Sequence, residues 1–253
     1  MSILAGFADI SLAQLLLVAA VALFASIIGG LAGYGTGALM PLVLVPLIGA
    51  EPVVPIIAIS AVITNISRFV AYFRYADRRR ALIVIAAAAL TTALGAYGYT
   101  RLTSTGAALV IGSMLIASVP LRRLAKRRDV RIGDTGLAAS AVGYGVVVGG
   151  TSGSGVILLS LLMASGLEGA AVIATDAVIS VATGLIKISV FGLAGVVTAQ
   201  VLAFALLIGA VAIPGAFFAK TFVERMPMHI HTAILDAAVI TGGVVMITSA
   251  LWH

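Results

Sequence analysis

The sequence predicts an all-α polytopic membrane protein made of two inverted repeats of about five segments each, with a short half-helix segment in each repeat. Of its 253 residues, 62% are hydrophobic and only 9% are charged, whereas a soluble domain carries roughly 25% charged residues. Apolar windows of about 20 residues, the length needed to span a bilayer, recur along the chain. Two glycine-rich stretches, GYGTGALMPLVLVPLIG at 33–49 and TSGSGVILLSLLMASG at 151–166, have nearly the same layout.

Apolar runs divide the chain into ten expected segments, bounded by prolines such as Pro52 and Pro227 and otherwise by glycines. The segments are 9–32, 36–48, 52–74, 80–99, 104–121, 134–150, 154–165, 169–191, 195–222 and 229–252. The second and the seventh are short: as helices they would extend about 18–20 Å at ~1.5 Å per residue, against a hydrocarbon core of roughly 30 Å. Each of these two follows a glycine-rich break, so the sequence predicts one half-helix in each repeat.

The positive charges predict the orientation in the membrane. Ten of the fifteen Lys and Arg residues lie in two short loops, Arg74 to Arg80 and Arg122 to Arg131. Cytoplasmic loops of multi-span proteins carry such an excess, and Lys220 and Arg225 mark a third loop in the same way. With ten segments, this arrangement places both termini outside the cell membrane.

Five segments per half is an odd number, so the second half must enter the membrane upside-down relative to the first. Sequence matches support this repeat: GTG at 35–37 corresponds to GSG at 153–155, and AISAVIT at 58–64 corresponds to ATDAVIS at 174–180. We therefore expect a first repeat at 1–121, a basic cytoplasmic linker at 122–133 and a second, inverted repeat at 134–253.

The two glycine-rich breaks are candidates for a binding site. Irregular backbone within a membrane is tolerated where protein or a water-filled cavity surrounds it, and half-helices in inverted repeats often form substrate sites. The N-terminus of a half-helix offers unpaired N–H groups and a partial positive charge, which suit an anion. The candidate anion-binding residues here are Gly35, Thr36, Gly37, Ser152, Gly153, Ser154 and Gly155. The alternative is that the glycines serve only close helix packing, as small-residue rows do in membranes.

Four polar residues inside the apolar segments are further candidates for substrate binding. Ionisable side chains within a membrane are costly and usually functional. Arg68, with Asn65 one turn away, lies in the third segment, and Lys187 lies in the eighth. Both cations could attract an anion, or they could extend to the membrane surface without any function. Asp176 could carry protons or pair with a cation, although a purely structural role is an equal alternative.

Other functions have little support. The basic residues form no face with interleaved aromatic residues, which argues against nucleic-acid binding. GYG at 33–35 lacks the flanking sequence of a potassium-channel filter, and GTSG at 150–153 lacks a histidine at depth to act as the base of an intramembrane protease. No cysteine is present. No catalytic residue, metal site or cofactor is therefore predicted, and the first apolar run is expected to be retained because it lacks a signal-peptide cleavage site.

The glycine-rich break, the short apolar segment with Pro41, the following acidic turn and AISAVIT, all repeated in the second half, resemble the TauE/SafE sulfite exporter family, whose members are related to the 4-toluene sulfonate uptake permeases. The resemblance covers the chain from about Gly29 to the last segment. It implies a multi-pass carrier of the inner membrane for sulfite, organosulfonates such as sulfoacetate, or other small anions. The sequence departs from the family pattern at AIS in the first repeat and ATD in the second, which leaves the roles of Ser60 and Asp176 open.

The function predicted from these features is export of a small sulfur-containing anion by alternating access, with the lipid bilayer and the anion as the partners. The alternatives are an anion channel of the same architecture, a carrier of another small organic anion, or a scaffold without transport. The direction, the coupling ion and the oligomeric state, including a homo-oligomer, stay open at this point.

Overall fold

The computed structural model describes residues 3–8, 10–32, 35–127, 131–223 and 228–252. These residues form ten α-helices and two short 3-10 helices, with no strand among them. The α-helices are α1 (Leu12–Ala32), α2 (Gly35–Ile48), α3 (Val53–Tyr72), α4 (Arg78–Tyr99), α5 (Ser104–Arg127), α6 (Asp134–Gly150), α7 (Gly155–Ala164), α8 (Ala170–Leu193), α9 (Ala199–Val223) and α10 (Met228–Trp252). The 3-10 helices are η1 (Ile3–Phe7) and η2 (Phe73–Tyr75).

The all-helical fold class is confirmed, and each expected segment coincides with one helix. The apolar span of the fifth segment ends at Leu121 as expected, but the helix α5 continues beyond it to Arg127. The added residues are mostly Arg, Lys, Leu and Ala, which are strong helix formers, and basic side chains are favourable at a helix C-terminus. Part of the expected basic linker is therefore helical. Gly33, Arg128 and Arg225, which also entered the predictions, lie outside the described residues.

Among the described residues, four helices are long and apolar enough to cross a membrane: Val53–Val70 in α3, α4, Ser104–Leu121 in α5, and α8. Shorter apolar stretches occur in α1, α2, α7, α9 and α10. Along α4, the side chains of Leu82, Leu90 and Leu94 are largely exposed. Their spacing of four and eight residues places them on one face of the helix. In a bilayer this face contacts lipid, so its exposure carries no hydrophobic penalty.

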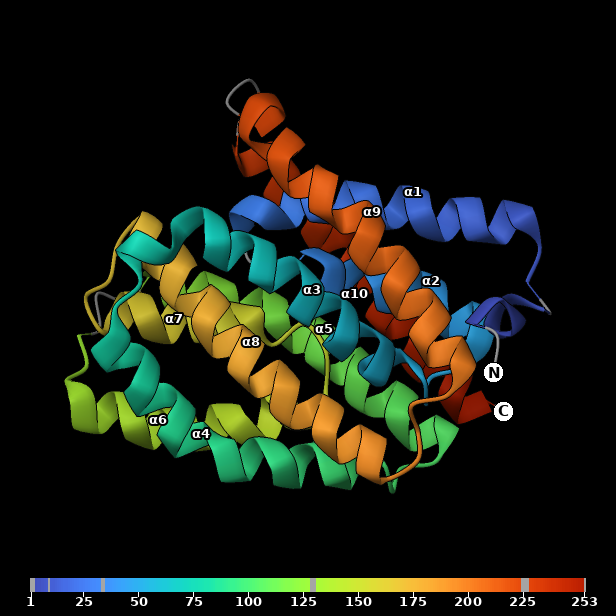
Figure 1. Cartoon of the computed structure of the whole chain (residues 1–253), viewed down its shortest axis with the longest axis horizontal. Helices are drawn as coiled ribbons and strands as arrows, with labels where there is room; N and C mark the ends of the chain where they lie inside the picture. Colours follow the sequence, from blue (N-terminus) through green and yellow to red (C-terminus); the bar gives the residue numbers. More distant parts are fainter. Residues whose placement is uncertain (1–2, 9, 33–34, 128–130, 224–227, 253) are drawn as a thin grey trace.

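The helices pack in a pattern that is regular along the chain. Helix α3 packs on α8, and α5 packs on α10 (Figure 1). Helix α4 contacts α6 and α8, while α9 contacts α1 and α3. When each helix is exchanged for the one five places away in the chain, this set of contacts is reproduced. Two repeats of five helices would give such a pattern, and the opposite orientation of the two halves in the membrane stays a prediction.

Glycines allow α4 and α6 to approach closely. A methyl group on Gly145 would collide with Thr91 and lie 2.7 Å from the carbonyl oxygen of Ala88. A methyl group on Gly149 would collide with the carbonyl oxygen of Thr92. The row of glycines in α6 therefore serves helix packing, which was one of the two alternatives for the glycine-rich stretches.

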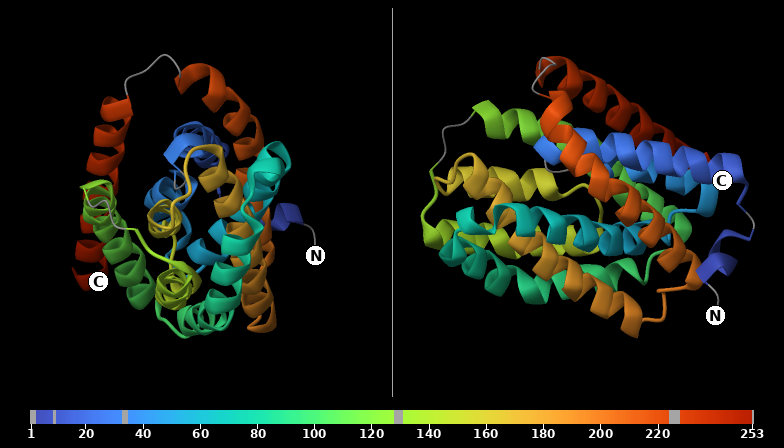
Figure 2. Two further views of the ribbon diagram at one scale, coloured as in Figure 1. Left: turned by 90° about the vertical axis from the view of Figure 1, so that its left-hand side faces the viewer. Right: turned by 45° about the horizontal axis from the view of Figure 1, so that its top comes forward.

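The short helix α7 lies inside a ring of longer helices, with α5 and α10 on one side and α3, α8 and α9 on the other (Figure 2, left). The N- and C-termini lie near each other at one end of the molecule, and the starts of α4 and α6 lie at the opposite end (Figure 1). The termini and the starts of α4 and α6 are thus separated by the length of the helices, and which of these two ends faces the cytoplasm stays a prediction.

Candidate functional site

The two glycine-rich breaks meet inside the molecule. At the first, α2 begins at Gly35; at the second, the chain leaves α6 at Gly150, passes through an extended Thr151 and enters α7 at Gly155. A methyl group on Gly37 would lie 3.0 Å from the backbone nitrogen of Gly153. Gly153 has φ of +80°, a conformation that side-chain-bearing residues rarely adopt. Gly37 and Gly153 are therefore needed for the two glycine-rich breaks to come into backbone contact, independently of any role in anion binding.

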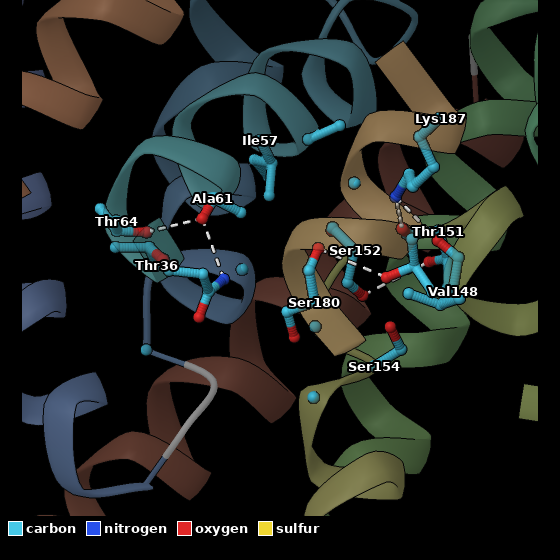
Figure 3. Close-up of a pocket in the computed structure, with 18 of the residues that line it drawn as sticks. Thr36, Ile57, Ala61, Thr64, Val148, Thr151, Ser152, Ser154, Ser180 and Lys187 are labelled. Carbon is cyan, nitrogen blue, oxygen red and sulfur yellow. Dashed lines mark hydrogen bonds between the residues drawn. The ribbon is translucent and has the colours of Figure 1, made fainter. Parts of the chain in front are cut away.

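A cavity of about 140 Å³ lies beside this contact (Figure 3). Ten of the eleven predicted binding residues line it: Gly35, Thr36, Gly37, Asn65, Arg68, Ser152, Gly153, Ser154, Gly155 and Lys187. The remaining predicted residue, Asp176, is not part of the lining but forms an ion pair with Arg68. The residues chosen from the sequence are thus brought to one place, although their role in binding is untested.

Hydroxyl groups line both sides of the cavity. Thr36 and Thr64 come from one side, and Thr151, Ser152 and Ser154 from the other (Figure 3). Ser152 is only 3% exposed, and its Oγ atom has no hydrogen-bond partner among the described residues. A buried hydroxyl without a partner is costly, so a ligand that accepts its hydrogen bond would remove this cost.

Lys187 caps the C-terminal end of α6. Its Nζ atom donates hydrogen bonds to the carbonyl oxygens of Val148 at 2.7 Å and Thr151 at 3.1 Å. The side chain is 5% exposed and lines the cavity rather than extending to the surface. Val148 belongs to the last turn of α6 and Thr151 directly follows the helix, and a cation is favourable at such a helix C-terminus. Because an ammonium group has three N–H bonds, one donor is left after these two hydrogen bonds.

Arg68 connects the cavity to a buried carboxylate. Its Nη1 atom donates to Asn65 Oδ1 at 3.1 Å and lies 3.5 Å from Asp176 Oδ2. Asn65 is held in place by a hydrogen bond of 2.9 Å from its Nδ2 atom to the carbonyl oxygen of Ala61, one turn earlier in α3. The guanidinium group is therefore positioned from two sides and still borders the cavity.

Several polar lining residues were not predicted from the sequence: Ser26, Thr64, Tyr144, Ser180 and Thr183. For two of these a signal was present. Thr64 and Ser180 are the last residues of AISAVIT and ATDAVIS, so they occupy equivalent positions in the two matching stretches. Ser26, Tyr144 and Thr183 lie in apolar helices without any such marker.

The charge of the cavity favours an anion. Among the described residues that line it, the charged side chains are those of Arg68 and Lys187, and no Asp or Glu is among them. In the same part of the chain, no group of three or more His, Asp or Glu residues could hold a metal ion. Fold and site together define a polytopic α-helical membrane protein with a cationic, hydroxyl-lined cavity at the junction of two half-helices.

Comparison with known proteins gives the family. The family model described as sulfite exporter TauE/SafE matches residues 18–246. The chain belongs to this family, and the resemblance stated from the sequence is confirmed. No curated protein and no solved structure matches the chain. Membership of a family of membrane exporters, together with the four apolar helices, identifies the chain as a membrane transport protein.

Proposed function

We propose that the protein is a carrier that exports a small sulfur oxyanion, either sulfite or an organosulfonate such as sulfoacetate, across the inner membrane by alternating access. The observation that carries the proposal is the cavity at the meeting of the two glycine-rich breaks, with two cations and no lining carboxylate among the described residues. The family supports the substrate class.

The lining matches the chemistry of a sulfite or sulfonate group. The three oxygens of such a group accept several hydrogen bonds, and an anion that leaves water must recover them inside the protein. Three side chains are available as donors: Ser152, whose hydroxyl has no partner among the described residues, Lys187 with its remaining N–H, and Arg68 with its guanidinium. The start of α7 adds backbone N–H groups with a favourable dipole. These donors come from α3, α8, the start of α7 and the segment before it, so a small anion would be held between them.

The position of the cavity suits alternating access. It lies between α3 and α8, which pack on each other, and it is lined by both half-helices. If the two repeats rock against each other, a site at their interface opens to one side of the membrane at a time. A sulfur oxyanion bound there would be carried across without a continuous pore.

A panel of anions tests the proposal on the detergent-purified protein. We expect sulfite or sulfoacetate to raise the melting temperature in a concentration-dependent manner, and carboxylates of similar size to have less effect. Arg68→Gln removes a charged donor and should weaken binding by roughly 10- to 100-fold, the equivalent of about 1.5–3 kcal/mol. Arg79→Gln is the matched control, because Arg79 is 80% exposed and pairs with Asp134 outside the cavity. Equal effects of the two substitutions, or stabilisation by none of the sulfur anions, would contradict the proposal.

A further inference from the structure

Asp176 is a buried carboxylate with incomplete compensation. Its side chain is 2% exposed, and its Oδ1 atom has no hydrogen-bond partner in the part of the chain that the structure describes. Within the described part of the chain, its one ion-pair partner is Arg68, at 3.5 Å. A buried charge is tolerated when it is paired and costly when it is not. The ionised state of Asp176 therefore depends on where the Arg68 guanidinium group is engaged.

Arg68 is the group that an anion in the cavity would also bind. It lines the cavity, whereas Asp176 lies behind it and does not. An anion and the carboxylate therefore compete for the same positive charge. When the anion binds the Arg68 guanidinium, Asp176 is still buried but no longer has a compensating positive charge. The protonated, neutral form of Asp176 then becomes the favoured one.

We propose that Asp176 takes up a proton when an anion occupies the cavity and releases it when the anion leaves, so that the carrier moves its substrate together with a proton. This inference rests on the proposed function, since it needs an anion at Arg68. On binding, a solvent proton forms an O–H bond with the carboxylate, and on release of the anion this bond breaks and the Arg68–Asp176 pair forms again. No other reactant is required.

The other charged and titratable groups near Asp176 are engaged elsewhere or distinguishable by mutation. On α6, the Tyr144 phenol is close enough to interact with the carboxylate. At the start of α4, Arg80 is bonded to Asp77 at 2.6 Å, and the Asp77 backbone N–H donates to Thr175, the neighbour of Asp176. On α8 itself, Lys187 lies three turns further along and is bonded to the end of α6. Among the described residues that line the cavity, Lys187 is the other group that could take up a proton, in the case that its amine is neutral before the anion binds.

Proton uptake can be measured directly by titration calorimetry of sulfoacetate binding near pH 7 in two buffers of different ionisation enthalpy. Sulfoacetate is fully ionised at this pH and contributes no proton of its own. For the wild-type protein we expect an uptake on the order of one proton per bound anion, and an apparent affinity that falls by up to about tenfold per pH unit in the alkaline range. Asp176→Asn should bind sulfoacetate with no proton uptake and with an affinity independent of pH.

Three further variants complete the experiment. Asp236→Asn is the matched control, because Asp236 is a buried carboxylate that lies 3.3 Å from Arg123 and is absent from the cavity lining; its uptake should equal that of the wild type. Asp176→Glu should keep the uptake and covers the case in which Asp176→Asn does not fold. Lys187→Gln should bind more weakly but keep the uptake.

Two results would overturn the inference while leaving the proposed function intact: binding of sulfoacetate by the wild type without proton uptake, or uptake that persists in Asp176→Asn and disappears in Lys187→Gln. Failure of sulfoacetate to bind the wild type at all would count against both.

Discussion

Replacing Gly149 by alanine should destabilise the protein, whereas the same change at Gly143 on the same helix should not. A methyl group on Gly149 would collide with the carbonyl oxygen of Thr92 and lie 2.8 Å from the backbone nitrogen of Ala96. Backbone atoms cannot rotate away as a side chain can, so α4 and α6 must separate. Around Gly143, a methyl group would meet no atom within 4 Å. The pair therefore isolates helix packing from helix propensity.

The magnitude follows from two opposing effects. Overpacking costs about 1–3 kcal/mol, while Gly→Ala in a helix interior gains about 1 kcal/mol at either position. The difference between the two variants should therefore be about 1–3 kcal/mol. For a chain of this size that corresponds to about 2–12 °C in melting temperature. Thermal unfolding followed by circular dichroism in one detergent measures it. Equal melting temperatures would refute the packing role of the α6 glycines.

Three further predictions concern other parts of the molecule. Lys187→Met removes the amine that binds two carbonyl oxygens at the end of α6. It should lower the free energy of unfolding by about 2 kcal/mol, and an unchanged free energy of unfolding would contradict this role of the amine. In the cysteine-free chain, cysteines introduced at Thr103 and Leu193 should react with an impermeant reagent from outside and one at Arg78 should not; the reverse labelling would contradict the orientation. At Asp77, burial alone would raise the pKa, but the hydrogen bonds and charge of Arg80 hold this pKa below its ordinary value. The contribution of Asp77 to stability is thus present at neutral pH and lost as the pH falls through this lowered pKa. Asp77→Asn should therefore reduce the loss of stability at acidic pH. An unchanged loss of stability at acidic pH would argue against the Asp77–Arg80 pair.

The fold could be predicted largely from the sequence, because apolar length and glycine-rich breaks are local signals. The half-helices at α2 and α7 follow directly from the glycines and the short apolar runs after them. The continuation of α5 to Arg127 was missed, because basic residues that end an apolar run can still extend a helix beyond the hydrocarbon. The boundary of a membrane segment and the end of its helix are set by different forces.

The candidate site was predicted in its composition but not in its contacts. Arg68 and Asp176 attracted attention because charges are rare in apolar helices, but their pairing depends on how α3 crosses α8. The hydrogen bonds from Lys187 to the end of α6 depend in the same way on helix packing. Tyr144 reaches the cavity from a helix whose sequence contains nothing unusual at that position. Such tertiary contacts leave no periodicity or spacing in a single sequence.

Counterflow in proteoliposomes tests the central claim, that the cavity at the two half-helices carries a small sulfur oxyanion. Vesicles loaded with unlabelled sulfite and diluted into radiolabelled sulfite should accumulate label transiently, with a rate that saturates as the sulfite concentration rises, because a carrier exchanges its substrate at one site. Arg68→Gln should reduce this rate by roughly 10- to 100-fold at low sulfite concentration, and Arg79→Gln should leave it near the wild-type value. Label that only equilibrates, without transient accumulation or saturation, would identify a channel, and equal rates in the two variants would contradict the assignment of the cavity as the transport site.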